Sequence, residues 1–519
     1  MLTKILSAAH FGLETLPVEV EVNLATKGFP GFTIIGLPTK SVEEAKERVK
    51  TALVNSGIDF PQAKIIVNLA PADIPKEGSC YDLPIAVGIL NSLGQIRLPA
   101  EKSFFYGELS LDGSLRHSKG VFLLALAAKN LKVANLFVPL PSANEAAVIK
   151  HLNIYPVSSL KQLVSHLVGL TPIQRLKITT KQSASALANQ ATAEFDFAEI
   201  MGQEQAKRAL EIAAAGGHNI FMQGPPGSGK TMLARALPGI LPPLTEEESL
   251  EVTKIYSVTG NIPPGGSLVT NRPFRSSHHT TSRAGLIGGD SPPRPGEISL
   301  AHCGVLFLDE FPEFSRSPLE ALRQPLEDGV VNISRAAGSV QFPAQFTLVA
   351  AANPCPCGFL GDPKNECRCS PRQILRYQAK LSGPLLDRID LHLNVPAVEV
   401  EKLMPLDSAR GKPIFKPESS AQIRARVIKA RNLQTARFQK TGIHSNAQMR
   451  NKHLKKFCHL TDEAYLLLKQ AVNNYHLSAR TYFRLIKVSQ TIADLSAEKT
   501  ITQSHVAEAL QYRLRFQEN

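Results

Sequence analysis

One octapeptide constrains the fold of this chain more than any other feature of its sequence. Residues 224–231 read Gly-Pro-Pro-Gly-Ser-Gly-Lys-Thr, which fits the pattern G-x-x-x-x-G-K-[ST]. The apolar run 219–222 precedes it, and the helix-like run 232–237 follows it. A glycine-rich turn between a strand and a helix can surround phosphate groups with backbone N–H groups. The octapeptide therefore predicts an α/β region that binds a nucleoside triphosphate.

Different residues of this phosphate loop are expected to contact different parts of the nucleotide and its metal ion. The glycines let the backbone curl around the phosphates, Lys230 meets the charge of the β- and γ-phosphates, and the Thr231 hydroxyl can ligate Mg²⁺. The predicted nucleotide-binding residues of the loop are Gly224, Pro225, Pro226, Gly227, Ser228, Gly229, Lys230 and Thr231.

Two later strand-like runs end in polar residues that suit the same chemistry. Residues 305–308 lead into Asp309 and Glu310, and residues 346–352 lead into Asn353. Asp309 is expected to hold the metal ion, and Glu310 to orient and deprotonate the attacking water. Asn353 would contact the γ-phosphate or that water, although it would also suit a plain turn. Together with the loop, these residues predict a nucleoside triphosphatase.

The length of 519 residues predicts about three domains. Residues 1–170 alternate strand-like and helix-like runs, as in an α+β domain, and residues 171–194 contain a stretch rich in Ser, Ala, Gln and Thr that suits a linker. Residues 195–396 have the pattern of a parallel sheet covered by helices, and residues 397–519 are mainly helical.

Positive charge is concentrated in one stretch of the chain. The formal net charge is +13, and residues 401–460 contain 14 Lys and Arg against three Asp and Glu. This stretch indicates either a solvated helix face or a surface for nucleic acid. No run approaches the length of a membrane-spanning helix, so no membrane partner is expected.

Four of the seven cysteines lie within fifteen residues, in two Cys-x-Cys pairs. Four thiolates suit a closed tetrahedral Zn²⁺ site, although the usual spacing is Cys-x-x-Cys. The alternative is a group of reduced thiols that are buried or redox-sensitive. The cysteine content favours a reducing, cytoplasmic location. The candidate ligands are Cys355, Cys357, Cys367 and Cys369.

Several longer strings resemble an AAA+ ATPase of the magnesium-chelatase-like type, and specifically the ComM/YifB family. The matching strings are residues 272–280, 286–289, 294–302, 325–329 and 382–390. The resemblance runs nearly end to end. It implies an AAA+ P-loop core with a C-terminal helical lid, and a homo-hexameric ring that hydrolyses ATP.

The resemblance also implies roles for residues outside the phosphate loop. Arg388 matches the arginine that reaches the γ-phosphate of a neighbouring subunit, unless it only pairs with a nearby aspartate. Arg480 matches the second sensor of the helical lid, the alternative being an ordinary exposed arginine. Ile200 and Gly202 match the stretch that lines the adenine pocket, although an apolar residue there also suits plain core packing.

Two segments are candidates for DNA contacts. The first is the insert between Lys230 and Asp309 that contains residues 272–282, for which the resemblance implies loops facing the ring pore. Arg272, Arg275 and Arg283 lie in or beside the first, and we expect them to contact phosphates. The second is hairpin-like, with Asp-Gly at positions 328–329 as its turn and Arg335 on its second strand. The alternative for both is structural packing, because no aromatic ladder accompanies the charges.

The N-terminal region resembles the peptidase domain of Lon, a ribosomal S5 domain 2-like fold. The matching segments are residues 75–78 and 107–113. The positions of Lon's serine and lysine fall on Cys80 and Leu124, so the catalytic dyad is missing, and Ser79 and Lys119 are only neighbours. The region is expected to be a non-proteolytic scaffold.

These observations predict an ATPase that binds DNA. The resemblance implies an ATP-driven DNA motor, a helicase that promotes branch migration and the integration of single-stranded or branched DNA in natural transformation. One alternative is a chelatase-type motor subunit, which would require partner subunits. Another is an ATP-dependent, protease-like remodeller, which Cys80 and Leu124 disfavour.

Overall fold

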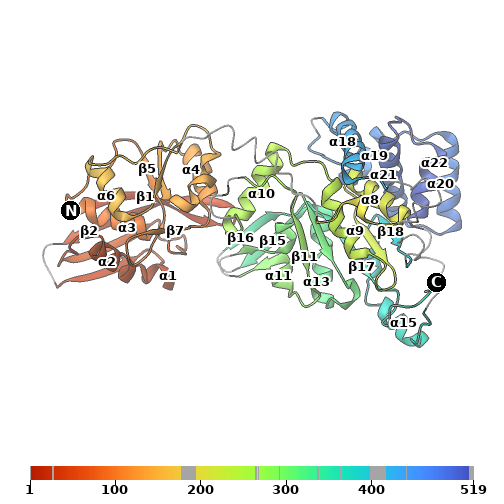
Figure 1. Cartoon of the computed structure of the whole chain (residues 1–519), viewed down its shortest axis with the longest axis horizontal. Helices are drawn as coiled ribbons and strands as arrows, with labels where there is room; N and C mark the ends of the chain where they lie inside the picture. The colour runs from red at the N-terminus through yellow and green to blue at the C-terminus, as the bar shows by residue number, and fades with distance from the viewer. Residues whose placement is uncertain are drawn as a thin grey trace, which may run out of the picture.

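The computed structural model of the chain describes residues 2–25, 29–176, 194–262, 266, 268–290, 293–335, 338–362, 365–397, 417–439 and 441–513. Three parts lie in a row along an elongated molecule (Figure 1). The N-terminal part is at one end, a parallel sheet is in the middle, and the C-terminal helices are at the other end. Most of the predicted linker and residues 398–416, which include the start of the basic stretch, lie outside the described residues.

The N-terminal part is built on a seven-stranded mixed sheet with the order β3-β4-β2-β1-β5-β8-β9. Side chains alternate along β2, where Val18, Val20 and Val22 are fully buried, as expected when one face of a strand packs on a core. The strands of this part are β1 (Leu2–Phe11), β2 (Glu14–Ala25), β3 (Gly31–Ile35), β4 (Lys64–Ala70), β5 (Ser103–Phe105), β6 (Glu108–Leu109), β7 (Leu115–Arg116), β8 (Asn135–Pro139) and β9 (Asn153–Val157). Its helices are α1 (Lys40–Glu43), α2 (Ala45–Asn55), α3 (Asp82–Ser92), α4 (Val121–Asn130), α5 (Ala143–Ala147) and α6 (Leu160–Val168).

The middle part contains the predicted parallel sheet, with five strands in the order β11-β14-β17-β10-β18. Its apolar strands are buried because helices cover both faces. The strands are β10 (Ile220–Gln223), β11 (Phe274–Ser277), β14 (Val305–Leu308), β17 (Thr347–Ala352) and β18 (Leu391–Asn394). The helices include α8 (Glu204–Gly216), α9 (Lys230–Ala236), α10 (Glu246–Thr259), α11 (Arg283–Ile287), α12 (Glu297–Leu300), α13 (Arg316–Ala321), α14 (Arg323–Asp328), α15 (Pro371–Gln378) and α16 (Gly383–Leu386). Two small ribbons complete this part, β12 (Gly288–Gly289) with β13 (Arg294–Pro295) and β15 (Val330–Arg335) with β16 (Gly338–Pro343).

The C-terminal helices pack on the same core as the parallel sheet. The buried His218 joins the two parts, since its ring nitrogens lie 3.0 Å from Asp390 Oδ2 and 2.8 Å from Thr491 Oγ1. The helices are α18 (Ser420–Arg437), α19 (Asn451–Phe457), α20 (Asp462–Asn474), α21 (Ala479–Leu495) and α22 (Gln503–Gln511). Within the described ranges, every helix is too short or too polar to span a bilayer.

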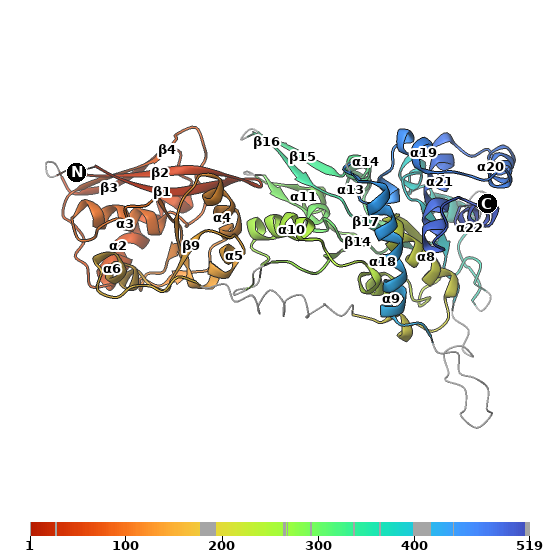
Figure 2. The ribbon, with the colours of Figure 1, turned by 90° about the horizontal axis from the view of Figure 1, so that it is seen from above.

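The N-terminal part docks on α10 and on the β15–β16 ribbon (Figure 2). The Gly120 N–H donates to the carbonyl of Ser257 at 3.0 Å, and the Ser257 hydroxyl donates to the Glu145 carboxyl group at 2.9 Å. Burial raises the pKa of Glu145 to about 7, although the Ser257 hydrogen bond opposes this shift. A buried titratable group therefore lies at the junction between the two parts.

Replacing Glu145 with Gln is expected to stabilise the chain at pH 8 but not near pH 5. In the unfolded chain the carboxyl group loses its proton near its ordinary pKa of 4.5, and in the folded chain near 7, so folding stability falls as the pH rises through this window. The amide of Gln keeps an oxygen that accepts the Ser257 hydrogen bond, and it cannot ionise. The substitution is therefore expected to raise the free energy of unfolding by about 2 to 3 kcal/mol at pH 8. Urea unfolding at both pH values checks this, with the exposed Glu101→Gln as the control. A Glu145→Gln gain that does not vary with pH would contradict it.

Candidate active site and metal centre

The phosphate loop joins the carboxyl end of β10 to the N-terminus of α9. A Cβ atom on Gly224 would lie 2.1 Å from the Val395 carbonyl oxygen, so only glycine fits between β10 and the end of β18. Gly229 caps α9 with a φ of 89°, in the left-handed region that favours glycine. The loop thus has the backbone shape that its sequence predicts.

Four predicted site residues converge beside this loop. Lys230 Nζ donates to the carbonyl of Gly224 at 2.7 Å and lies 3.3 Å from Asn353 Oδ1. The Thr231 hydroxyl donates to Asp309 Oδ2 at 3.0 Å. Burial lowers the pKa of Lys230, an effect that the Asp309 carboxylate opposes. A hydroxyl and a carboxylate side by side form the oxygen donor set that suits Mg²⁺ next to a triphosphate.

Glu310 extends beyond Asp309 and contacts a residue that the sequence did not single out. Its side chain is 54% exposed, and His279 Nδ1 lies 2.9 Å from its Oε2. His279 follows β11, the strand adjacent to β14 in the sheet. The signal that identifies His279 is its position, because the carboxyl ends of neighbouring parallel strands meet at one edge.

The stretch upstream of the loop has one more contact that sequence reasoning missed. Ile200 is buried, which suits both an adenine pocket and core packing, and Gly202 adopts a positive φ of 66°. The next residue, Gln203, donates its amide to the carbonyls of Ser228 at 3.3 Å and Pro396 at 2.6 Å. The side chain of Gln203 therefore ties the phosphate loop to the segment after β18.

Arg388 and Arg480 both approach the same carboxylate. Arg388 Nη2 lies 2.6 Å from Glu327 Oε1, and Arg480 Nη2 lies 3.8 Å from the same oxygen. The nearby Asp390 is instead occupied by Arg484 and His218, which hold its pKa below the usual range although burial opposes this. The side chain of Arg388 is 10% exposed and that of Arg480 is 58% exposed.

These two arginines lie at the edge of the sheet opposite the phosphate loop. Strands β10 and β18 run parallel, with Ile220 opposite Leu391 and Gln223 opposite Asn394. The phosphate loop follows β10, whereas Arg388 precedes β18, so roughly 10 Å of strand separates the two ends. Arg484 keeps Arg480 near this edge, since it donates to the Arg388 carbonyl at 2.9 Å. Neither arginine is placed to contact a nucleotide on its own loop.

The arginines predicted to contact DNA differ in their surroundings. Phe274–Ser277 form β11 of the main sheet and pair with β14, so this part of the expected insert is a strand and not a loop. Arg275 forms a bidentate pair with Glu297 at 2.6 and 2.7 Å. Arg272 donates to the Cys303 carbonyl at 2.6 Å and pairs with Glu248. These contacts favour the packing alternative for both arginines.

Arg283 and Arg335 are instead both exposed. Arg283 begins α11, and a Cβ atom on Gly289 would lie 3.2 Å from Arg335 Nη2 and 3.5 Å from Ala284 Cβ. Arg335 ends the first strand of its ribbon, not the second as predicted, because Gly329 caps α14 with a φ of 68°.

The four clustered cysteines converge as a metal site requires. Their sulfur atoms all lie within 4.8 Å of one another. Cys355 Sγ is 3.3 Å from Cys357 Sγ and 3.7 Å from Cys367 Sγ, and the latter two are 3.6 Å apart. Sulfur atoms bound tetrahedrally to Zn²⁺ at about 2.3 Å would be about 3.8 Å apart. The donor set therefore fits a tetrathiolate metal site.

A second group, Glu251, His302 and Cys303, does not fit a metal. His302 Nδ1 accepts the Gln345 N–H at 3.1 Å, so the ring proton is on Nε2. That nitrogen lies 3.0 Å from Glu251 Oε2. Because Nε2 carries the ring proton, it has no free lone pair with which to bind a metal ion.

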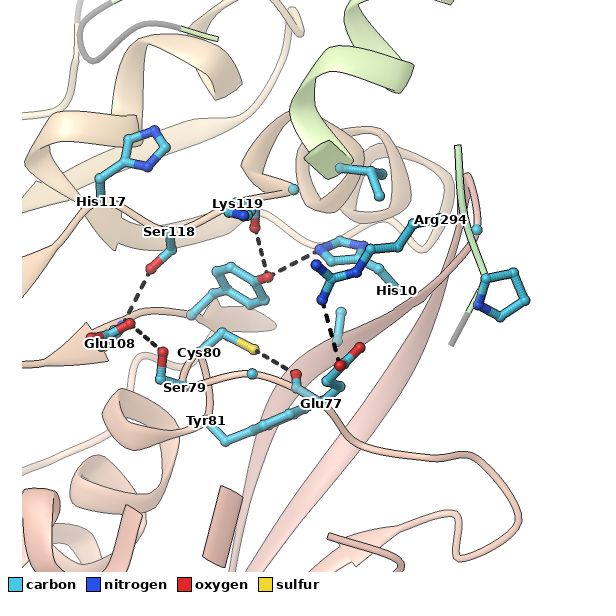
Figure 3. Close-up of a pocket in the computed structure, with 17 residues that line it drawn as sticks. His10, Glu77, Ser79, Cys80, Tyr81, Glu108, His117, Ser118, Lys119 and Arg294 are labelled. Carbon is cyan, nitrogen blue, oxygen red and sulfur yellow. Dashed lines mark hydrogen bonds and ion pairs between the residues drawn. The ribbon is translucent and has the colours of Figure 1, made fainter. Parts of the chain in front are cut away.

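Cys80, at the position of Lon's serine, lines a cavity of about 320 Å³ together with its neighbours Ser79 and Lys119 (Figure 3). Leu124, at the position of Lon's lysine, is buried in α4 and does not line this cavity. Cys80 is buried, and this raises the pKa of its thiol to about 12. The Ser79 hydroxyl donates to Glu108. The side chain of Lys119 packs on Gly260, where an added Cβ would lie 2.6 Å from Lys119 Cε. The raised pKa disfavours a thiolate at Cys80, and the hydrogen-bond partner of the Ser79 hydroxyl is a carboxylate and not a lysine.

The parallel sheet, the phosphate loop and the Lys230, Thr231 and Asp309 cluster define a P-loop nucleoside triphosphatase of the AAA+ class. Three sequence models match: magnesium chelatase subunit ChlI over residues 196–403, subunit ChlI of Mg-chelatase over 18–142, and the ChlI C-terminal region over 417–513. The chain is 46% identical to competence protein ComM of Haemophilus influenzae, covering 98% of this chain and 96% of that protein. It is 42% identical to the uncharacterized protein YifB of Escherichia coli and 41% identical to that of Salmonella typhimurium, each over 97% of this chain and 96% of the relative.

The chain therefore belongs to the ComM/YifB family, as its sequence strings indicated. Membership of a magnesium-chelatase-like AAA+ family implies ATPase activity and the cofactors ATP and Mg²⁺.

Proposed function

We propose that this protein is an ATP-driven hexameric DNA motor, a helicase that promotes branch migration and the integration of DNA during natural transformation. The observation that carries the proposal is the position of Arg388 and Arg480 at the edge of the sheet opposite the phosphate loop. An arginine placed there can stabilise transition-state charge only on a nucleotide held by another copy. A ring of identical subunits provides such neighbours at every interface. The role in transformation rests on the resemblance to the competence protein ComM.

In this proposal, each ATP binds between two subunits. Lys230 and the loop amides hold the phosphates, Thr231 and Asp309 hold Mg²⁺, and Glu310 activates water. Arg388 of the next copy completes the site. The helical part moves with the nucleotide state through Arg480 and Arg484, and this motion drives the DNA contacts.

The basic helix α19 offers a further surface for the DNA backbone. Its residues Lys452, Lys455 and Lys456 are exposed, and among the described residues none of them pairs with a carboxylate. Slight burial and the charges of Lys452, Arg450 and Lys456 lower the pKa of His453, which indicates a positive local potential. With Arg283 and Arg335, this helix supplies the charge that a sequence-independent motor needs.

We propose that the four cysteines hold Zn²⁺, for which the sulfur separations are suited. A cytoplasmic location would keep these thiols reduced.

A second candidate is a chelatase-type motor, which the match of all three ChlI sequence models favours. Because a ChlI sequence model also matches residues 18–142, the N-terminal part is compatible with a chelatase-type motor. The contacts of Cys80, Ser79 and Lys119 weigh against a protease-like remodeller.

The purified chain is expected to displace a strand from three-stranded DNA only when ATP is present.

Lys455→Glu with Lys456→Glu should reduce DNA affinity at least tenfold and flatten its salt dependence, because each lost phosphate contact lowers the salt slope by about one. The matched control is Lys161→Glu with Lys64→Glu, two exposed lysines of the N-terminal part. Gel-resolved strand displacement and salt titrations check this. Displacement without ATP, or ATPase activity that requires partner subunits and ignores DNA, would contradict the proposal.

A further inference from the structure

The four-cysteine loop is attached to the nucleotide site at both ends. It begins at Asn353, directly after β17, where the Asn353 side chain lies 3.3 Å from Lys230 Nζ. It ends at α15, whose Tyr377 interacts with the backbone of Asn353. Beyond α15, Lys380 pairs with Glu313 at 2.7 Å, three residues after Glu310. The loop and α15 therefore span the edge of the sheet where the catalytic residues lie.

Gly358 of the four-cysteine loop contacts the phosphate loop. A Cβ atom on Gly358 would lie 2.6 Å from Cδ of Pro226 and 3.9 Å from Cγ of Asn353. Gly358 has a φ of +86°, and its N–H donates to the Cys355 carbonyl at 3.0 Å. The residue after the first cysteine pair is thus held in contact with the loop that cradles the phosphates.

The four cysteines flank Gly358 and constrain its contact with Pro226. Cys355 is fully buried, and the other three thiols close around it from both arms of the loop. Thiolates at such separations repel one another, and a bound divalent cation converts that repulsion into a crosslink between residues 355–357 and 367–369. The crosslink would hold Gly358 in its position on Pro226.

We propose that the metal-bound cysteine loop is a positioning element of the nucleotide site. The metal fixes Gly358 against Pro226 and Asn353 beside Lys230, so that metal and nucleotide each favour the binding of the other. This inference rests on the proposed nucleotide function of the phosphate loop. It assigns the loop a regulatory role, because loss of the metal weakens nucleotide binding without removing any residue of the phosphate loop.

Coupling between two ligands is reciprocal, which provides two independent readouts. Removing Zn²⁺ from the full-length chain with a chelator is expected to raise the Kd for a fluorescent ATP analogue by about 5- to 150-fold, the usual range of such coupling. Saturating the loaded chain with the same analogue is expected to raise its affinity for Zn²⁺ by the same factor, as measured by equilibrium competition with a chromogenic chelator. Both readouts are independent of turnover.

Two glycine variants test the contact while leaving the metal in place. Gly358→Ala places a methyl group against Pro226, whereas Gly361→Ala, in the same loop, has no neighbouring atom within 4 Å. Both positions have a positive φ, +86° and +76°, so backbone strain is matched. Gly358→Ala is expected to keep its Zn²⁺ and bind the analogue at least fivefold more weakly. Gly361→Ala is expected to bind like the parent.

The outcomes separate this inference from the proposed function. A loaded parent chain that fails to bind the analogue would refute the nucleotide function itself. If the parent binds but the stripped chain and Gly358→Ala bind equally well, the positioning role is refuted. Purified protein with under about 0.2 zinc per chain, against the one ion of a tetrathiolate site, would also overturn it.

Discussion

Replacing Arg388 with Ala is expected to lower ATP turnover by about 10³-fold or more and to leave nucleotide affinity nearly unchanged. The phosphate loop and Arg388 lie at opposite ends of the parallel strands β10 and β18, so the substitution touches no group that holds the nucleotide in its own chain. It removes the cation that would face the γ-phosphate of a neighbour. Steady-state ATPase assays and equilibrium binding of a fluorescent nucleotide separate the two effects.

The matched control is Arg97→Ala, an exposed arginine of the N-terminal part. It is expected to have parental activity. If Arg388→Ala weakened nucleotide binding as strongly as turnover, Arg388 would be a structural partner of Glu327 and not a residue of the neighbouring site. Parental turnover in Arg388→Ala would lead to the same conclusion.

Replacing Glu310 with Gln is expected to reduce turnover by about 10³-fold and to trap bound ATP, since an amide cannot take a proton from water. Asp309 keeps its hydrogen bond from Thr231, so the metal and phosphate contacts are unaffected. Rapid-quench measurements should show intact ATP on the protein after many parental turnover times. Glu247→Gln, at an exposed position of α10, is the control. Rapid ATP hydrolysis by Glu310→Gln would assign the water-activating role to another group.

Local chemistry explains which parts of the fold could be predicted from the sequence. The parallel strands are continuous apolar runs, and the phosphate loop is a contiguous motif, so both are visible without tertiary information. Strand β11 is short and contains Arg275 and two serines, so only its pairing with β14 identifies it. Gly329 suits a hairpin turn and a helix C-cap equally well. Taken as a turn, it predicts Arg335 on the second strand, whereas Arg335 ends the first strand, β15.

The long-range contacts of the candidate site lay beyond sequence reasoning for a different reason. Glu327 lies 61 positions before Arg388 and far from Arg480, yet all three meet because α14, α16 and α21 converge. The contact between Pro226 and Gly358 depends on the backbone path of two loops. The interaction of His279 with Glu310 needs two neighbouring strands. Such pairs carry no periodic or motif signal.

Mixing two inactive variants tests most directly whether hydrolysis requires two copies of the chain. Lys230→Ala removes the phosphate contact but keeps Arg388, and Arg388→Ala does the reverse. Randomly mixed rings would contain intact partners at about a quarter of their interfaces. ATP turnover is therefore predicted to recover on mixing to about that fraction of the parental rate. A mixture as inactive as its two components, under conditions where the chains exchange, would contradict the shared site.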